Sequence, residues 1–264
     1  MAFLEGGAEQ ALRDGGHDVS AVTIDMPRAA SSEIGAVFVI NQLLATEVRR
    51  ALGSGVFPIV LAGNCNHCLG TVSGVGLPEL GVVWFDAHGD FNSPDTSQSG
   101  FFDGMSLHVA TGNSWHALAG TIPGFRPVAE RNVVLAGVRD LDEAERAALD
   151  VSSVMLAEEP ALLAAGIEAA LAPPLDAVSS RMRDVYLHID LDVLDPETAP
   201  INGYQPPGGL QVSQLVEALE MVGQRFQVRA AALASYDPAC DPEGNGLNAG
   251  LEVLKAFGEI GWGP

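Results

Sequence analysis

The chain has 264 residues, of which 47 % are hydrophobic, so it is long enough to fold as one large domain around a sizeable core. It carries 34 Asp and Glu residues against 13 Lys and Arg residues, a formal charge of −21, which argues against a nucleic-acid partner because phosphates would be repelled. The same charge attracts cations, either divalent metals or a positively charged substrate, although solubility or adaptation to high salt explains it equally well.

No apolar run reaches the length of a membrane-spanning helix, and the first residues lack the pattern of a signal peptide. We therefore expect a cytoplasmic protein with no membrane partner. The three cysteines, Cys65, Cys68 and Cys240, are too few for a disulfide framework in a chain of this length.

Short apolar runs alternate with segments of helical spacing along the chain. We interpret residues 6–15 as the first helix. We expect strands at 22–24, 58–61, 82–85, 133–136, 185–190 and 230–234, and helices at 34–52, 141–149, 160–172 and 212–222. This alternation predicts a single α/β domain over residues 1–264, in which helices cover both faces of a mainly parallel sheet in a three-layer αβα arrangement.

Polar clusters follow three of the predicted strands. Residues 64–67 follow the second strand, residues 86–92 the third, and residues 190–195 the fifth. Because ligands gather beyond the carboxyl ends of the strands in such a sheet, these chain-distant acidic residues should converge on one edge.

The two acidic clusters have the spacing of metal ligands. Asp86, His88 and Asp90 alternate along one segment, and residues two apart on an extended backbone point the same way. Asp190 and Asp192 do the same farther along. Four carboxylates in one pocket resist ionisation unless a cation compensates them, and mixed carboxylate and imidazole ligands suit Mn²⁺. Singly, each Asp can be a helix cap or loop residue and His88 a core histidine, but together they favour two bound metal ions.

These motifs resemble the arginase/agmatinase/formimidoylglutamase (ureohydrolase) family. Residues 84–92, Trp-Phe-Asp-Ala-His-Gly-Asp-Phe-Asn, resemble its second metal motif, and residues 188–196, His-Ile-Asp-Leu-Asp-Val-Leu-Asp-Pro, its Asp-x-Asp-x-x-Asp-Pro motif. Residues 61–66 fall where the family has Gly-Gly-Asp-His-Ser, and residues 137–140 and 208–210 match in order and spacing. The resemblance runs from about residue 34 to the end, and it implies a trimer or hexamer.

The resemblance also implies roles for the acidic residues. Asp86 and Asp190 would bridge two divalent metal ions, most simply Mn²⁺. His88 and Asp192 would complete the shell of one metal, and Asp90 that of the other while orienting a bridging hydroxide. The implied reaction is attack of this hydroxide on the carbon of a linear amidine or guanidino compound, with cleavage of a C–N bond. Two metals lower the pKa of a bridging water enough for this at neutral pH.

The sequence departs from the family at the first metal. Cys65 stands where the family has its first histidine ligand, and a thiolate prefers Zn²⁺ or Fe²⁺ to Mn²⁺. His67 is an alternative ligand, but in a helix that starts there it would point elsewhere. Asp103 stands where arginase-type members have a histidine that serves in proton transfer. Asp103 can serve likewise if its pocket raises its pKa, or it is a simple loop acid.

The residues expected to bind the substrate are matched only in part. Asn92 and Ser99 resemble residues that bind an amino-acid carboxylate, and Asp142 matches one near the α-amino group. Phe101 falls where a further polar contact would be expected.

The family's guanidinium-binding glutamate is replaced by Ser235, which cannot form a bidentate carboxylate–guanidinium pair. Asp237 or Asp241 can compensate from a shifted position. We therefore do not expect arginine itself to be the substrate.

The amino terminus departs as well, because the family usually begins with a strand that this chain apparently lacks. That strand would lie inside the sheet, so its loss should leave backbone groups unpaired and destabilise the protein, unless the start codon is misassigned.

Three other interpretations stay open. The first is a non-catalytic or mono-metal binding protein on the same fold. The second is a redox protein built on the Cys65-x-x-Cys68 pair, for which no thioredoxin-like feature follows. The third is a zinc amide deacetylase, which needs only an Asp-x-His pair and a distant Asp.

Overall fold

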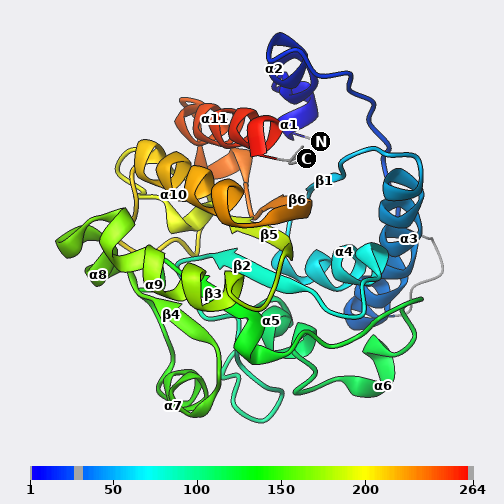
Figure 1. The fold of residues 1–264 in the computed structure, drawn as a ribbon, viewed down its shortest axis with the longest axis vertical. Coiled ribbons are helices and arrows are strands. Elements are labelled where there is room, and N and C mark those ends of the chain that lie inside the picture. The colour runs from blue at the N-terminus through cyan, green and yellow to red at the C-terminus, as the bar shows by residue number, and fades with distance from the viewer. Residues whose placement is uncertain (1, 27–31, 261–264) are drawn as a thin grey trace.

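One sheet of six parallel strands lies at the centre of the computed structural model, which describes residues 2–26 and 32–260 (Figure 1). The strands are β1 (Ile59–Leu61), β2 (Gly81–Phe85), β3 (Val133–Ala136), β4 (Met155–Ala157), β5 (Asp184–Asp190) and β6 (Gln227–Ala234). Their spatial order is β1-β6-β5-β2-β3-β4, and every neighbouring pair is parallel. The carboxyl ends of all the strands therefore lie at the same end of the sheet.

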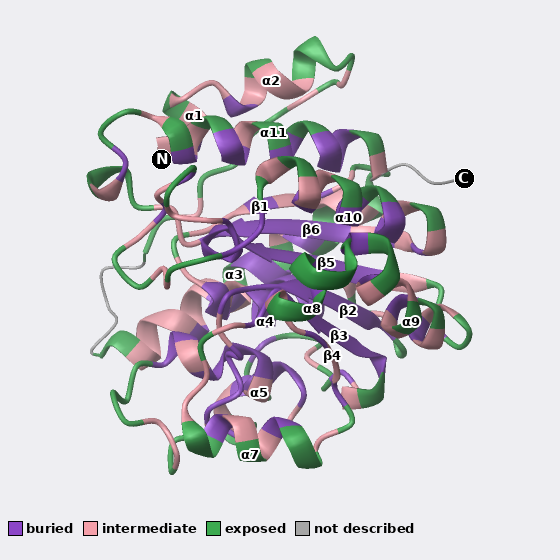
Figure 2. Cartoon of the chain, turned by 90° about the vertical axis from the view of Figure 1, so that its left-hand side faces the viewer, coloured by how far each residue is buried: buried purple, intermediate pink, exposed green. Residues whose placement is uncertain are grey.

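Helices cover both faces of the sheet, and the buried strands lie between them (Figure 2). The core on one face includes residues of α9 (Ile167–Ser179), α10 (Val212–Arg225) and α11 (Asn245–Ile260). The core on the other face includes residues of α3 (Glu33–Gly53), α4 (Cys68–Val75) and α5 (Ser106–Ala110). The remaining helices are α1 (Ala2–Glu5), α2 (Ala8–Asp14), α6 (His116–Ala119), α7 (Glu143–Val151) and α8 (Glu159–Ala165). Short 3₁₀ turns complete the chain: η1 (Cys65–His67), η2 (Asp103–Met105), η3 (Glu130–Asn132), η4 (Leu191–Val193) and η5 (Pro238–Cys240).

Local sequence explains the main elements. All residues of β2 and β3 are buried, as expected for central parallel strands, which read as continuous apolar runs. Helix α3 starts after Ser32, whose side chain accepts a hydrogen bond from the Gly35 backbone N–H at 3.1 Å. Helix α10 starts with a capping box between Gln211 and Gln214.

The predicted α/β architecture and parallel sheet are confirmed, as are five of the six predicted strands. The strand expected at 22–24 is wrong: this segment is irregular, and the Val22 side chain is 58 % exposed, so it gains no burial from pairing with the sheet. Strand β4 was not expected, because three residues are too short for a periodic signal. The helix expected at 160–172 is interrupted at Gly166, whose φ of 91° ends α8 before α9 begins. The helix expected at 6–15 corresponds to α2, with α1 ahead of it.

Strands β1 and β4 are the two edges of the sheet formed by the described residues. No helix of the described residues is both long enough and apolar enough to cross a membrane. The assignment of residues 1–264 to a single domain stays a prediction.

Candidate metal centre

Two groups of potential metal ligands lie beyond the carboxyl ends of β1, β2 and β5. Cys65, Asp86 and Asp190 form the first group, with ligand atoms all within 4.8 Å of one another. Asp86, His88 and Asp192 form the second group by the same criterion. The two groups share Asp86, so they are adjacent. The convergence expected from the sequence is therefore present: Asp86 follows β2, Asp190 ends β5, and these strands are direct neighbours.

The first group is buried and closely packed. The Cys65 thiol donates to Asp190 Oδ2 at 2.9 Å, and its Sγ lies 4.0 Å from Asp86 Oδ2. Trp84 Nε1 donates to the same Asp86 oxygen at 3.0 Å, and the Ser235 hydroxyl donates to Asp190 Oδ2. Each of the two carboxylates thus accepts hydrogen bonds from neutral side-chain donors.

The second group is ordered by short-range backbone contacts. His88 Nδ1 lies 3.3 Å from Asp86 Oδ1 and 3.3 Å from Asp192 Oδ2. The His88 backbone N–H donates to Asp86 Oδ1 at 2.8 Å, and the Asp192 backbone N–H donates to Asp190 Oδ1 at 2.9 Å. The turns that follow the two strands therefore fix the carboxylates.

Asp90 completes the acidic cluster without belonging to either group. Asp90 is buried, its backbone has a φ of 49°, and its Oδ2 has no hydrogen-bond partner among the described residues. A left-handed backbone and an unpaired buried carboxylate oxygen are both costly, and they cluster at functional sites. An added cation would satisfy this oxygen.

The electrostatics of the cluster call for positive charge. Burial, with Asp192 beside it, raises the pKa of Asp86 to about 6. Burial and the neighbouring carboxylates likewise raise the pKa values of Asp90 and Asp190 well above their usual range. Burial alone would lower the pKa of His88, but its hydrogen bonds to Asp192 and Asp86 outweigh burial and raise that pKa to about 12. Added positive charge would relieve the repulsion between these buried carboxylates, so the residues fit a pair of divalent ions.

Cys65 and Cys68 lie in different environments. Cys65 faces the carboxylates, whereas the Cys68 thiol donates to the Ser106 carbonyl oxygen at 3.7 Å. Both are free and buried, and burial raises both pKa values well above 9.0, the opposite of what a reactive Cys-x-x-Cys pair needs. His67 Nδ1 contacts the Asn64 carbonyl oxygen, and His67 belongs to neither ligand group of the described residues.

Asp103 binds the segment that carries Cys65. Its Oδ1 accepts from the Asn66 backbone N–H at 2.8 Å and from Asn66 Nδ2 at 3.1 Å, while its Oδ2 accepts from Asn64 Nδ2 at 3.0 Å. These bonds join η1 to η2. A hollow adjoins Asp103, with Val37, Ile40, Phe101 and Phe102 among its apolar lining residues.

The structure brings together some of the residues expected to bind substrate. Asn92 Nδ2 donates to Asp142 Oδ2 at 3.3 Å. Ser99 is exposed on the same loop as Asn92, and its hydroxyl oxygen accepts from the Phe101 backbone N–H at 3.1 Å. Ser235, with a φ of 71°, lies against Asp190 and Cys65.

The two candidates for compensating the lost glutamate have local partners. Asp237 Oδ1 accepts from the Ala239 backbone N–H at 2.9 Å. Asp241 Oδ2 accepts from the Tyr236 hydroxyl at 2.9 Å and from the Leu247 backbone N–H at 2.9 Å. Neither belongs to a ligand group of the described residues.

Several supporting residues were not foreseen from the sequence. Arg139 donates to the Asp192 carbonyl oxygen at 2.9 Å and to four neighbouring carbonyl oxygens of the same turn and a following loop. Glu145 accepts from the Phe91 backbone N–H at 2.7 Å, and burial raises its pKa to about 7. Arg139 lies in a matched family segment, but nothing in the residue pattern revealed these contacts.

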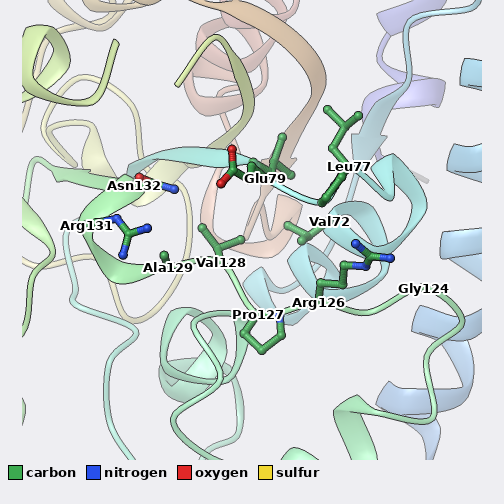
Figure 3. A pocket seen from close by; sticks show the side chains of 12 residues that line it. Val72, Leu77, Glu79, Gly124, Arg126, Pro127, Val128, Ala129, Arg131 and Asn132 are labelled. Carbon is green, nitrogen blue, oxygen red and sulfur yellow. The ribbon is translucent and has the colours of Figure 1, made fainter. Parts of the chain in front are cut away.

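A second hollow lies at the opposite end of the sheet (Figure 3). It is lined by residues before β2 and β3, among them Glu79, Arg126 and Arg131. It contains none of the predicted site residues. The candidate centre is therefore the acidic cluster at the carboxyl ends of the strands.

Comparisons with known proteins identify the family of the chain. A family model described as "Arginase family" matches residues 8–257. The arginase of Bacillus caldovelox is 32 % identical over 228 residues, covering 85 % of this chain and 76 % of that protein. The arginase of Bacillus subtilis (strain 168) is 30 % identical over 247 residues, covering 91 % and 83 %.

Solved structures are similar over nearly the whole chain. The crystal structure of arginase from Bacillus subtilis has a TM-score of 0.89 at 29 % identity, covering 99 % of this chain and 91 % of that one. Arginase from Bacillus cereus has a TM-score of 0.87 at 28 % identity, covering 100 % and 91 %. Formimidoylglutamase from Bacillus subtilis, at 19 % identity and a TM-score of 0.75, shows the shared fold. Because the family model matches residues 8–257 and the arginase of Bacillus caldovelox is 32 % identical, the chain belongs to the arginase family.

Proposed function

We propose that the protein is a dinuclear metal-dependent hydrolase that cleaves a C–N bond of a linear amidine or guanidino compound. The observation that carries this proposal is that two groups of candidate metal ligands share Asp86 beyond the carboxyl ends of the strands. Cys65, Asp86, Asp90 and Asp190 would hold one ion, and Asp86, His88, Asp190 and Asp192 the other. The expected metals are two Mn²⁺, or Zn²⁺ or Fe²⁺ at the Cys65 position. When bound, they would supply a hydroxide nucleophile at neutral pH.

The protein groups would orient and bind. Asp90, whose Oδ2 has no hydrogen-bond partner among the described residues, would accept a hydrogen bond from the nucleophile and orient it. Asn92 and Ser99 would bind the far end of the substrate, with Asp142 beside Asn92. The acidic field around the site would attract a cationic substrate.

Asp103 would act in proton transfer near the leaving group, or it would only position the segment carrying Cys65. Both of its oxygens accept hydrogen bonds, which favours the positioning role. Replacing Asp103 with Asn separates the two roles. A shuttle predicts a lost limb in the pH profile of kcat, whereas positioning predicts weaker metal binding with an unchanged profile.

Ser235 would leave room beside the metals without pairing with a guanidinium, because its hydroxyl is engaged with Asp190. We therefore propose a small amidine or guanidino substrate other than arginine. We further propose a cytoplasmic homo-oligomer, a trimer or hexamer, whose size sedimentation analysis would measure.

The test is a screen of the full chain, stripped of metal and reloaded with Mn²⁺, Zn²⁺ or Fe²⁺. Guanidino and formimino compounds would be assayed for release of urea, ammonia or formamide. We expect one of these to be hydrolysed by the wild type and not by Asp190→Asn. Loaded protein that turns over none of them, or an Asp190→Asn variant as active as the wild type, would contradict the proposal.

A further inference from the structure

A buried imidazole lies directly behind Cys65. His188, on β5, is fully buried two residues before Asp190. Its Nε2 lies 3.1 Å from Cys65 Sγ, and its Nδ1 lies 2.7 Å from the Tyr186 hydroxyl oxygen. Although His188 belongs to neither ligand group of the described residues, it touches one member of the first group. The proposed hydrolysis assigns it no role.

The neighbours of His188 fix which of its nitrogens carries the proton. As a metal ligand Cys65 would be a thiolate, whose Sγ can only accept from His188, so Nε2 would be the N–H donor. A neutral imidazole has one N–H, so Nδ1 is the acceptor and the Tyr186 hydroxyl donates to it. The three side chains therefore form one directed chain of hydrogen bonds from Tyr186 through His188 to Cys65.

The face of the His188 ring is also packed against a neighbour. It stacks on Trp84 of β2, with ring centroids 3.7 Å apart and planes inclined by 16°. The two residues are direct partners in the β2–β5 register. Trp84 Nε1 in turn donates to Asp86 Oδ2 at 3.0 Å. Two stacked, fully buried rings thus form the floor of the site, and each gives one N–H to a candidate metal ligand.

We propose that His188 is a specificity-determining residue of the metal centre: its Nε2–H holds the Cys65 sulfur as a ligand and favours Zn²⁺ or Co²⁺ over Mn²⁺ in the Cys65–Asp86–Asp190 group. The inference rests on the proposed metal centre and assigns a role within it. Because thiolate ligands are soft, they select these metals over Mn²⁺. A hydrogen bond to the sulfur orients it and offsets part of the negative charge it shares with two carboxylates.

The expected effect is a change in metal selectivity. Partners behind metal ligands are typically worth about 10- to 100-fold in metal affinity. Loss of the Nε2–H should therefore weaken Zn²⁺ binding about 10- to 100-fold, while Mn²⁺, which depends mainly on the carboxylates, should be affected much less. A merely structural role of His188 would weaken both metals alike.

Three variants of the full chain test the proposal. His188→Phe keeps a ring to stack on Trp84 and removes the donor, whereas His188→Gln keeps an N–H donor of similar reach. Tyr186→Phe removes the hydroxyl that fixes the proton on Nε2. Cys68→Ala is the matched control, because this buried thiol faces Ser106 instead of the carboxylates.

The measurements use metals alone. Zn²⁺ and Mn²⁺ dissociation constants come from chelator competition, and Co²⁺ titration reports the sulfur-to-cobalt charge-transfer absorption that only a bound thiolate gives. We expect this absorption in the wild type and in Cys68→Ala, its loss in Cys65→Ser, and its weakening in His188→Phe. His188→Gln should keep most of the Zn²⁺ preference, and Tyr186→Phe should lose part of it.

Wild-type selectivity in His188→Phe, or equal losses for Zn²⁺ and Mn²⁺, would overturn the inference. If His188→Phe does not fold, as judged by circular dichroism, His188→Gln and Tyr186→Phe are compared instead. Unchanged metal selectivity in Tyr186→Phe together with lost selectivity in His188→Gln would contradict the proposed chain of hydrogen bonds. A protein that binds Co²⁺ through sulfur but hydrolyses no amidine would refute the proposed function alone. A protein that hydrolyses amidines with unchanged selectivity in the His188 variants would refute this inference alone.

Discussion

Replacing Asp90 with Asn should stabilise the metal-free protein and weaken its response to metal. Asp90 is 6 % exposed, its Oδ2 has no partner among the described residues, and burial among other carboxylates raises its pKa well above the usual range. An unsatisfied buried polar group costs about 1 to 3 kcal/mol, and more if it is charged. At neutral pH the metal-free fold must either keep a buried charge on Asp90 or take up a proton that the unfolded chain does not bind, and Asn needs neither. The free energy of unfolding of the metal-free chain at pH 7 should therefore rise by about 1 kcal/mol or more.

The effect of metal should have the opposite sign. At a free metal concentration about 100 times Kd, binding stabilises the folded state by about 2.7 kcal/mol. For a chain of this size that corresponds to a rise in Tm of about 5 to 10 °C. Asp90→Asn loses one ligand, so its metal-induced shift should be smaller than that of the wild type.

Thermal melts with EDTA and with Mn²⁺ or Zn²⁺ measure both effects. Asp95→Asn is the matched control, because Asp95 is exposed on the loop that follows Asp90 and should change neither value. An Asp90→Asn variant that is less stable than the wild type without metal would refute the reasoning from charge repulsion. An equal metal shift in both proteins would refute the assignment of Asp90 as a ligand.

Three further changes test the supporting residues. Gly137→Ala should lower the free energy of unfolding by about 2 to 4 kcal/mol, measured in urea, because Gly137 has a φ of 94° and an added Cβ would lie 2.3 Å from Val193 Cγ2. Arg139→Lys should weaken metal binding about tenfold in calorimetric titration, because lysine cannot reach the several carbonyl oxygens that the guanidinium holds around Asp192. Burial raises the Glu145 pKa to about 7 from an ordinary 4.5, so the folded state binds this proton more tightly and the wild type loses stability as the pH rises through that range. In Glu145→Gln the decrease in the free energy of unfolding between pH 4.5 and 8, measured by urea unfolding in metal-free buffer, should be smaller by about 3 kcal/mol. The same decrease in both proteins would contradict the raised pKa of Glu145.

The sequence predicted the parts of the fold that depend on continuous patterns. Strands such as β2 and β5 are apolar runs bounded by turns, and the order of strands and helices implied a parallel sheet. The segment at 22–24 had the same apolar look, but three residues carry too little pattern to separate a strand from an exposed connection. Strand β4 was missed for the same reason, and the end of α8 at Gly166 depends on a single left-handed residue.

The residues of the candidate site also fall into those that the sequence could predict and those that it could not. Asp86, His88, Asp190 and Asp192 were predictable because alternation along a strand end puts them on one side, and β2 and β5 proved to be neighbours. Cys65 follows another strand, but its role as a ligand rests on the resemblance to the family and stays a prediction. Each of these inferences needs the path of one segment and the position of a strand end.

The floor of the site was not predictable, because it depends on register between strands. Trp84 and His188 stack only because β2 and β5 pair so that these two residues face each other, and no spacing within either segment encodes that pairing. Both lie within the two sequence motifs, but nothing in the motifs indicates a role for them. A one-residue shift of register would part the two rings and move His188 and Asp190 relative to Asp86, whereas the hydrogen bond from Trp84 to Asp86 lies within one segment and would stay. The two motifs therefore bring the candidate ligands Asp86, His88, Asp190 and Asp192 together, whereas the contact of His188 with Trp84, behind the residue to which we attribute the choice of metal, depends on how the two strands pair.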